Sequence, residues 1–238
     1  MADRVDEILA AQMHVLGEQH HDTLDTMEIK AMCLREGGKL DEALELHLRC
    51  LELTKKVLGH KDPDFSRTVH NLGFIYNIRG EHNKALEYFM QSLDLIRKYQ
   101  PGAEKHRETL YTIGYIGEIY DTLGQYEKAL EFFHLAQRGS EETLGLANIS
   151  TMTLASNLAI VYCRLRRFED ALKWGLDCVE GCKGLYGLLH KYTLHEVSNV
   201  IEIYGKLGRV EEALQLARDL VDGYVGCMGR TIWTHRRR

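Results

Sequence analysis

The chain has little proline and no long apolar run. Only two of its 238 residues are proline, and no stretch reaches the roughly 18–20 consecutive apolar residues that a membrane span requires. The first residues include Asp3 and Asp6 and lack an apolar core, which does not fit a signal peptide. These absences predict a cytoplasmic protein that does not contact a membrane.

Motifs for catalysis, cofactors and metals are also missing. The sequence contains no GxxxxGKS/T, no GxGxxG after a strand, no HExxH and no GxSxG. Its six cysteines lack CxxC spacing, which indicates reduced thiols, and its twelve histidines form no cluster with ligand spacing. The net charge of −5 disfavours nucleic acid, because phosphate binding needs a basic excess. We therefore expect neither an enzyme nor a cofactor, metal or nucleic-acid ligand.

What the sequence does contain is one pattern that returns five times. Each copy has a turn residue followed five or six residues later by an Ala-Leu pair, as in Gly124 with Ala129 and Leu130. The turn residues are Gly38, Gly80, Gly124, Arg166 and Gly208, which are 42, 44, 42 and 42 positions apart. A fixed period in this range is typical of a stacked repeat array.

Each copy is predicted to be a helical hairpin. Before the turn, apolar residues such as Ile113, Ile116 and Ile119 follow helical spacing. Glycine at the turn ends this helix, because it adopts a left-handed conformation without steric penalty. Small residues occupy one column on each helix, where the two helices must approach closely. They are Ala31, Gly73, Gly117 and Ala159 on the first helix, and Ala43, Ala85, Ala129, Ala171 and Ala213 on the second.

The pattern resembles the tetratricopeptide repeat (TPR), and within it the long-period subtype of kinesin light chains. The small residue, Tyr, Gly and Ala recur in order, with the tyrosine column formed by Tyr76, Tyr120, Tyr162 and Tyr204. The linkers carry Leu16-Gly17, Leu58-Gly59, Leu144-Gly145 and Tyr186-Gly187, with the departure of Arg166 for a turn glycine. The resemblance implies an all-α, right-handed superhelical solenoid of helix-turn-helix hairpins.

The period sets the expected boundaries. We predict a TPR array over residues 1–229 and a basic tail over 230–238, which we expect to be solvated and disordered. The array comprises a partial repeat at 1–17 and repeats at about 23–58, 66–99, 107–144, 151–186 and 192–226. At the ends, Val5, Ile8, Leu9, Ile232 and Trp233 lack a neighbouring repeat to cover them. Uncovered apolar faces favour self-association.

The resemblance also implies where a ligand binds, because the first helices of such repeats line a concave groove. The candidate peptide-binding residues face this groove: Arg67, His70, Asn71, Phe74, Asn77, Tyr111, Tyr115, Glu118, Ser156, Asn157, Ile160, Asn199 and Glu202. Asparagine recurs in one column at positions 71, 157 and 199, and its amide both donates and accepts. This column either bonds an extended peptide backbone or braces neighbouring helices.

Taken together, these features predict a non-enzymatic interaction module or scaffold. Its ligand would be a peptide or a partner protein held in the concave groove. Two alternatives stay open. One is that the chain is the sensor or regulatory repeat part of a larger signalling ATPase-type protein. The other is that it is an architectural homo-oligomer that stacks through its uncapped ends.

Overall fold

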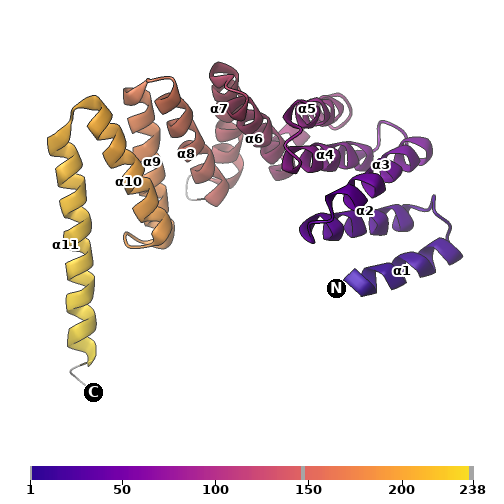
Figure 1. The fold of residues 1–238 in the computed structure, drawn as a ribbon, viewed down its shortest axis with the longest axis horizontal. Helices are drawn as coiled ribbons and strands as arrows, with labels where there is room; N and C mark the ends of the chain where they lie inside the picture. The colour runs from indigo at the N-terminus through magenta and orange to yellow at the C-terminus, as the bar shows by residue number, and fades with distance from the viewer. Residues whose placement is uncertain (1, 146–147, 236–238) are drawn as a thin grey trace. The chain divides into compact units, whose positions relative to one another are not determined.

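The computed structural model describes residues 2–145 and 148–235 (Figure 1). Over these residues the chain is helical throughout and contains no strand. The helices are α1 (Ala2–Val15), α2 (His21–Glu36), α3 (Leu40–Val57), α4 (Pro63–Ile78), α5 (His82–Tyr99), α6 (Arg107–Thr122), α7 (Tyr126–Leu144), α8 (Ile149–Arg164), α9 (Phe168–Tyr186), α10 (Lys191–Leu207) and α11 (Val210–His235), with a 3-10 turn, η1 (Ala103–Lys105). No helix in this part of the chain is both long and apolar enough to cross a membrane.

The helices form two compact units, Met1–Ile119 and Tyr120–Arg238, with the boundary inside α6. In the first unit α1 packs on α2, α2 on α3, α3 on α4 and α4 on α5. In the second unit the same sequential packing joins α7, α8, α9, α10 and α11. Figure 1 shows the consecutive helices of each unit folding back on one another as hairpins.

The two helices of a hairpin begin differently. The first helix is capped by a linker side chain that accepts a backbone N–H: His20 caps α2, Asp62 caps α4, Asn148 caps α8 and His190 caps α10. The second helices α3, α5, α7 and α9 have no side-chain cap. They follow a turn residue with positive φ at Gly38, Gly80, Gly124 and Arg166. His20 and His190 thus have a structural role at helix starts.

The small-residue columns form the seam of each hairpin. Ala31, Ala43, Ala85, Ala129 and Ala171 have no exposed surface. A Cβ added to Gly73 would lie 2.8 Å from Cδ1 of Phe89, so α4 and α5 approach as closely as glycine permits. Ala213 in α11 is only half-buried.

The tyrosine column is buried against the second helices and covered by cations. Tyr76, Tyr162 and Tyr204 are at most 9% exposed. In each of four hairpins, a Lys or Arg near the start of the second helix lies over the tyrosine ring at 4.7–5.2 Å: Lys84 over Tyr76, Lys128 over Tyr120, Arg167 over Tyr162 and Arg209 over Tyr204. This repeated cation–π contact ties the turn to the first helix.

Helix α1, at the start of the chain, buries Leu9 but not Ile8. Leu9 of α1 is buried in a cluster with Leu24, Met27, Cys50 and Leu53. The next repeat thus covers Leu9, whereas Ile8 is 45% exposed. At the other end, α11 continues to His235, so residues 230–235 have helical backbone where we expected a disordered tail. Residues 236–238 and the side chains of Ile232 and Trp233 lie outside what the structure describes.

Candidate functional site

Each compact unit contains a cavity lined by its first helices. The cavity of the first unit has a volume of about 800 Å³ and is lined by α2, α4 and α6, with the end of α5 and the segment before α6. Six of the predicted site residues line it: Arg67, His70, Asn71, Phe74, Tyr111 and Tyr115. We call it the unit 1 groove.

Aromatic rings form the centre of the unit 1 groove. Tyr115 lies edge-on to Phe74, with ring centroids 5.1 Å apart, and stacks on Phe89 at 5.8 Å. The guanidinium of Arg35 lies 4.8 Å from the Phe74 centroid. Burial, and then the charge of Arg35, lowers the pKa of His70 to about 4. His70 is therefore neutral at pH 7, and its Nδ1 lies 2.9 Å from the hydroxyl of Thr112.

An ion-pair network lies at the rim of this groove. Nη2 of Arg67 lies 2.8 Å from Oδ1 of Asp25 and 3.0 Å from Oδ1 of Asp64. His21 places Nδ1 at 3.3 Å from Asp25 and Nε2 at 3.0 Å from Asp64. Ligand atoms of His21, Asp25 and Asp64 lie within 4.8 Å of one another. Arg67 contacts both carboxylates, and the two imidazole nitrogens of His21 face them, so these four side chains form one polar network.

The floor of the groove contains a desolvated carboxylate. Glu28 is 6% exposed, and its Oε2 lies 3.0 Å from Nδ1 of the fully buried His47. Asn71 donates from Nδ2 to the same oxygen at 2.8 Å. Burial would raise the pKa of Glu28, but hydrogen bonding and charge from His47, with Asn71, hold it below its usual value. Asn71 thus braces α4 against α2, which is the second of the two readings of the asparagine column.

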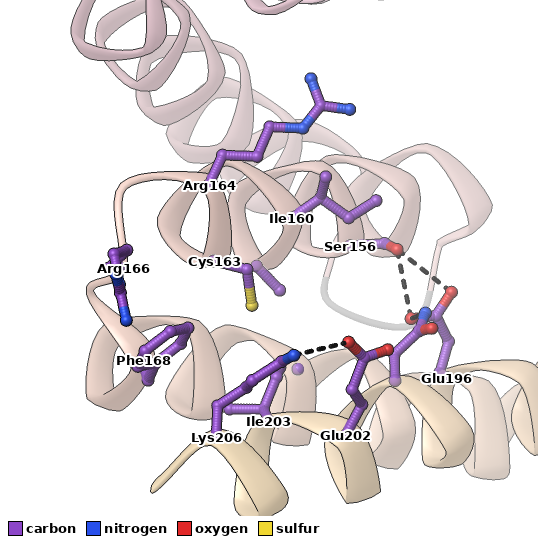
Figure 2. A pocket seen from close by; sticks show the side chains of 13 residues that line it. Ser156, Ile160, Cys163, Arg164, Arg166, Phe168, Glu196, Glu202, Ile203 and Lys206 are labelled. Carbon is purple, nitrogen blue, oxygen red and sulfur yellow. Dashed lines mark hydrogen bonds and ion pairs between the residues drawn. The ribbon is translucent and has the colours of Figure 1, made fainter.

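The cavity of the second unit has a volume of about 460 Å³ and lies between α8 and α10, with Phe168 and Gly175 of α9. Four of the predicted site residues line it: Ser156, Ile160, Asn199 and Glu202. Figure 2 shows Arg166 and Phe168 at one end, Ser156 and Glu196 at the other, and Cys163 with Ile203 between them. We call it the unit 2 groove.

Polar contacts in the unit 2 groove centre on Glu196. Ser156 lies 3.1 Å from both of its carboxylate oxygens, and Nδ2 of Asn199 donates to Oε2 at 3.3 Å. Lys206 lies 3.7 Å from Glu202, and Arg164 lies 2.6 Å from Asp121 (the former pair is drawn in Figure 2). No ion pair links Arg166 to any residue that the structure describes.

The cysteine of the unit 2 groove, Cys163, has a raised thiol pKa, as do three buried cysteines elsewhere in the chain. Burial, followed by the charge of Glu202, raises the pKa of the Cys163 thiol. Cys50, Cys178 and Cys182 are buried, and burial raises the pKa of each. Because the thiolate is the reactive form, these thiols are poor nucleophiles at neutral pH.

Three predicted site residues line neither groove: Asn77, Glu118 and Asn157. Oδ1 of Asn77 lies 3.1 Å from Nδ1 of His82, at the turn of its own hairpin. Conversely, the choice of groove-facing positions on the first helices missed three residues that line the unit 2 groove. Phe168 and Gly175 come from a second helix, α9, and Glu196 lies about one turn before Asn199 on α10. Arg166 could have been selected from the sequence, because it replaces glycine in the turn column.

Family models place the chain in a known class. Models described as tetratricopeptide repeat match residues 22–98, 64–142 and 151–190, which together exceed half of the chain. The chain therefore belongs to the tetratricopeptide repeat family, whose members generally act as scaffolds for protein–protein interaction. A model described as PPR repeat matches residues 197–223, which cover most of α10 and the start of α11.

Solved structures share the fold at low sequence identity. BtubC (BKLC) from P. vanneervenii has a TM-score of 0.75 at 16% identity, covering 96% of this chain and 90% of that one. A putative kinesin light chain with nearly identical TPR-like repeats from Podosopora anserina has a TM-score of 0.73 at 20% identity, covering 87% and 98%. YrrB, a TPR protein with an unusual peptide-binding site, has a TM-score of 0.62 at 16% identity, covering 90% and 91%. The fold is the all-α TPR solenoid of the kinesin-light-chain-like subtype.

Protein HGV2 of Halocynthia roretzi is 28% identical over 89 residues. The match covers 34% of this chain and 18% of that protein. The chain therefore spans a small part of this relative.

Proposed function

We propose that the chain is a non-enzymatic interaction module that holds a peptide, or an extended segment of a partner protein, in the grooves formed by its first helices. The observation that carries this proposal is that each compact unit has a cavity lined by first helices. Ten of the thirteen residues selected from sequence line one cavity or the other.

The character of the exposed side chains supports the proposal. Ile29 is 51% exposed, Tyr111 40% and Ile160 41%, and all three line a groove. Exposing a large apolar side chain to water is unfavourable, by roughly 25 cal/mol for each Å² of apolar surface. A ligand that covers them recovers this energy, and aromatic anchors commonly carry most of the affinity of an interface.

The test uses the full chain as bait, with cross-linking and mass spectrometry to locate bound segments. Tyr115→Ala should weaken capture of a partner by about 2 kcal/mol if the partner lies in the unit 1 groove. Asn199→Ala, in the unit 2 groove, should cost about 1 kcal/mol or less if the partner lies there, as the loss of a neutral hydrogen bond does. Glu131→Ala, on the exposed face of α7, is the control. Equal capture by all four proteins, or cross-links confined to the outer faces, would place binding elsewhere.

Self-association is a second candidate, favoured by the apolar surface of α11. Val210, Leu214 and Val221 are 50–60% exposed on this helix. Exposed apolar patches of this kind promote association. Sedimentation at increasing concentration tests it, with Leu214→Glu as the variant that should remain monomeric. A monomer at all concentrations would remove this candidate.

A further inference from the structure

The charged side chains of the unit 1 groove are predominantly acidic. Its lining contains the carboxylates of Asp25, Glu28, Asp64 and Glu108, and the guanidinium groups of Arg35 and Arg67. His70 adds no positive charge at pH 7, because burial and Arg35 hold its pKa at about 4. Carboxylates therefore outnumber cations by two in this lining.

Both of the groove's cations are already engaged. Arg67 is shared between Asp25 and Asp64 at 2.8 and 3.0 Å, so one guanidinium serves two carboxylates. The side chain of Arg35 is 15% exposed and lies over the ring of Phe74. An incoming carboxylate would have to displace one of these contacts and would also face the excess negative charge.

Acceptors for a cation remain. Glu108 is exposed in the first turn of α6, and its carboxylate makes no hydrogen bond or ion pair with any described residue. The two carboxylates of Asp25 and Asp64 share a single guanidinium, that of Arg67. Aromatic faces and exposed aliphatic side chains, including Ile29 and Met32, lie in the same groove. Long cationic side chains suit such a surface, because the aliphatic stem packs on apolar groups while the charged head meets carboxylates or aromatic rings.

We infer that the unit 1 groove selects a basic segment of a partner protein, with Lys or Arg side chains alternating with apolar ones. This inference rests on the proposed function and adds the chemistry of the ligand. The charged heads meet the Asp25–Asp64 pair and Glu108, and the apolar side chains cover Ile29, Met32 and the aromatic centre. Complementary charge supplies selectivity, because a like-charged ligand is repelled.

Two fluorescein-labelled peptide amides test the inference on the full chain. One is Leu-Arg-Phe-Lys-Leu-Arg, and the other carries Glu in place of each cation. By fluorescence anisotropy, the basic peptide should bind at least about tenfold more tightly, and its affinity should fall between about 50 and 200 mM salt. Hydrogen exchange should show protection on α2, α4 and α6.

Charge reversal separates the groove from general attraction by an acidic protein. Glu108→Lys should weaken the basic peptide by about tenfold, because it changes the local charge by two units beside the ligand. Glu131→Lys makes the same change on α7, outside either groove, and should alter the affinity by less than about twofold. Circular dichroism verifies that both variants keep the fold.

The remaining outcomes overturn the inference in distinguishable ways. Tighter binding of the acidic peptide with protection on α2 and α4 would refute the charge preference and leave groove binding intact. Equal effects of the two charge reversals would mean that the basic peptide is attracted by the net charge of the chain and not by the unit 1 groove. If neither peptide binds at about 1 mM while capture of a partner still depends on Tyr115, the basic segment is wrong and the proposed function stands. If capture does not depend on Tyr115 either, both fail.

Discussion

The two grooves are built from the same repeat and have opposite charge. In the unit 1 groove carboxylates exceed cations, and aromatic rings form the centre. In the unit 2 groove Arg164, Arg166 and Lys206 outnumber Glu196 and Glu202, and the apolar surface comes mainly from Ile160, Ile203 and Phe168. The repeat fixes the seam and the turn, since those positions are buried or sterically restricted. Groove-facing positions are under neither restriction, so neighbouring hairpins of one array can present different chemistry.

The carboxylates that brace the two grooves differ in burial. Glu28 is desolvated and meets the fully buried His47, whereas Glu196 is half-buried and meets Ser156 and Asn199. Glu28 holds α2, α3 and α4 together, and Glu196 joins α10 to α8. The same type of side chain therefore has a larger structural role in the first unit.

Removing these two carboxylates should produce the largest difference between the units. Glu28→Ala leaves buried His47 and Asn71 without their partner, which should destabilise the first unit by about 3 kcal/mol or more. Glu196→Ala should cost the second unit about 1 kcal/mol, because water can replace it. Hydrogen exchange, read helix by helix, assigns each loss to its unit. Equal losses would mean that the burial of Glu28 has no energetic consequence.

The second largest difference should be in how the stability of each unit changes as the pH falls. His70 has a pKa of about 4 in the folded chain and about 6.5 when unfolded. Below pH 6.5 the unfolded chain binds the proton first, so this contribution to stability falls as the pH drops from about 6.5 to about 4, by at most about 3 kcal/mol. His134 in the second unit also has a lowered pKa, chiefly from burial.

His70→Gln removes this titration. The hydrogen-exchange protection of α4 and α6 should therefore fall less in this variant as the pH is lowered from about 6.5 to about 4. His134→Gln is the matched variant in the second unit, and should leave protection of α4 and α6 unchanged. Glu28 also has a lowered pKa, so its contribution is fully present above its unfolded pKa and is lost as the pH falls through its folded pKa. A His70→Gln profile that still falls between pH 6.5 and 4 would contradict the assignment.

The sequence predicted what the repeat dictates and missed what individual side chains decide. Turn residues and the alanine seam follow from steric rules, so the hairpins were predictable from Ala43, Ala85 and the glycine column. The roles of the asparagines were not. Whether Asn71 faces a ligand or Glu28 depends on a contact 43 residues away in sequence, which no local pattern specifies.

Glu196 shows the same limit. It lies outside the inner-face column of α10, and reaches the groove because its carboxylate accepts hydrogen bonds from Ser156 of α8. Phe168 comes from the start of a second helix. The groove floor thus combines elements that the first-helix rule treats separately.

Overpacking a close contact between two helices should give a smaller difference between the units. At Gly73 a new Cβ would meet three atoms of the Phe89 ring at 2.8–3.0 Å, and that ring is buried and stacked on Tyr115. At Gly175 it would meet a single atom closely, Cγ2 of Val200 at 2.9 Å. Gly73→Ala should therefore cost about 2 kcal/mol, and Gly175→Ala about 1 kcal/mol or less. Urea unfolding with hydrogen exchange measures both, and a stabilised Gly73→Ala protein would mean that α4 and α5 separate easily.

The smallest effect concerns the one turn that lacks glycine. Arg166 has a φ of 58°, and the equivalent turns at Gly80 and Gly124 have φ of 75° and 72°. A side chain in this left-handed conformation costs about 1 kcal/mol, so Arg166→Gly should stabilise the second unit by that amount. Gly80→Arg should destabilise the first unit by a similar amount, which makes it the reciprocal test in the same type of turn.

Arg166 also places a cation at one end of the unit 2 groove, beside Phe168. Strained residues of this kind often serve a site rather than the fold. Because cations outnumber carboxylates in the unit 2 groove, we expect the weaker binding of the acidic peptide to occur there. Arg166→Gly should therefore raise the melting temperature and weaken that binding further, while the basic peptide keeps its affinity for the first unit. Arg166→Asn separates the two effects, because asparagine tolerates the left-handed conformation but carries no charge. If both variants bind the acidic peptide like the parent chain, the strain at Arg166 has no role in binding.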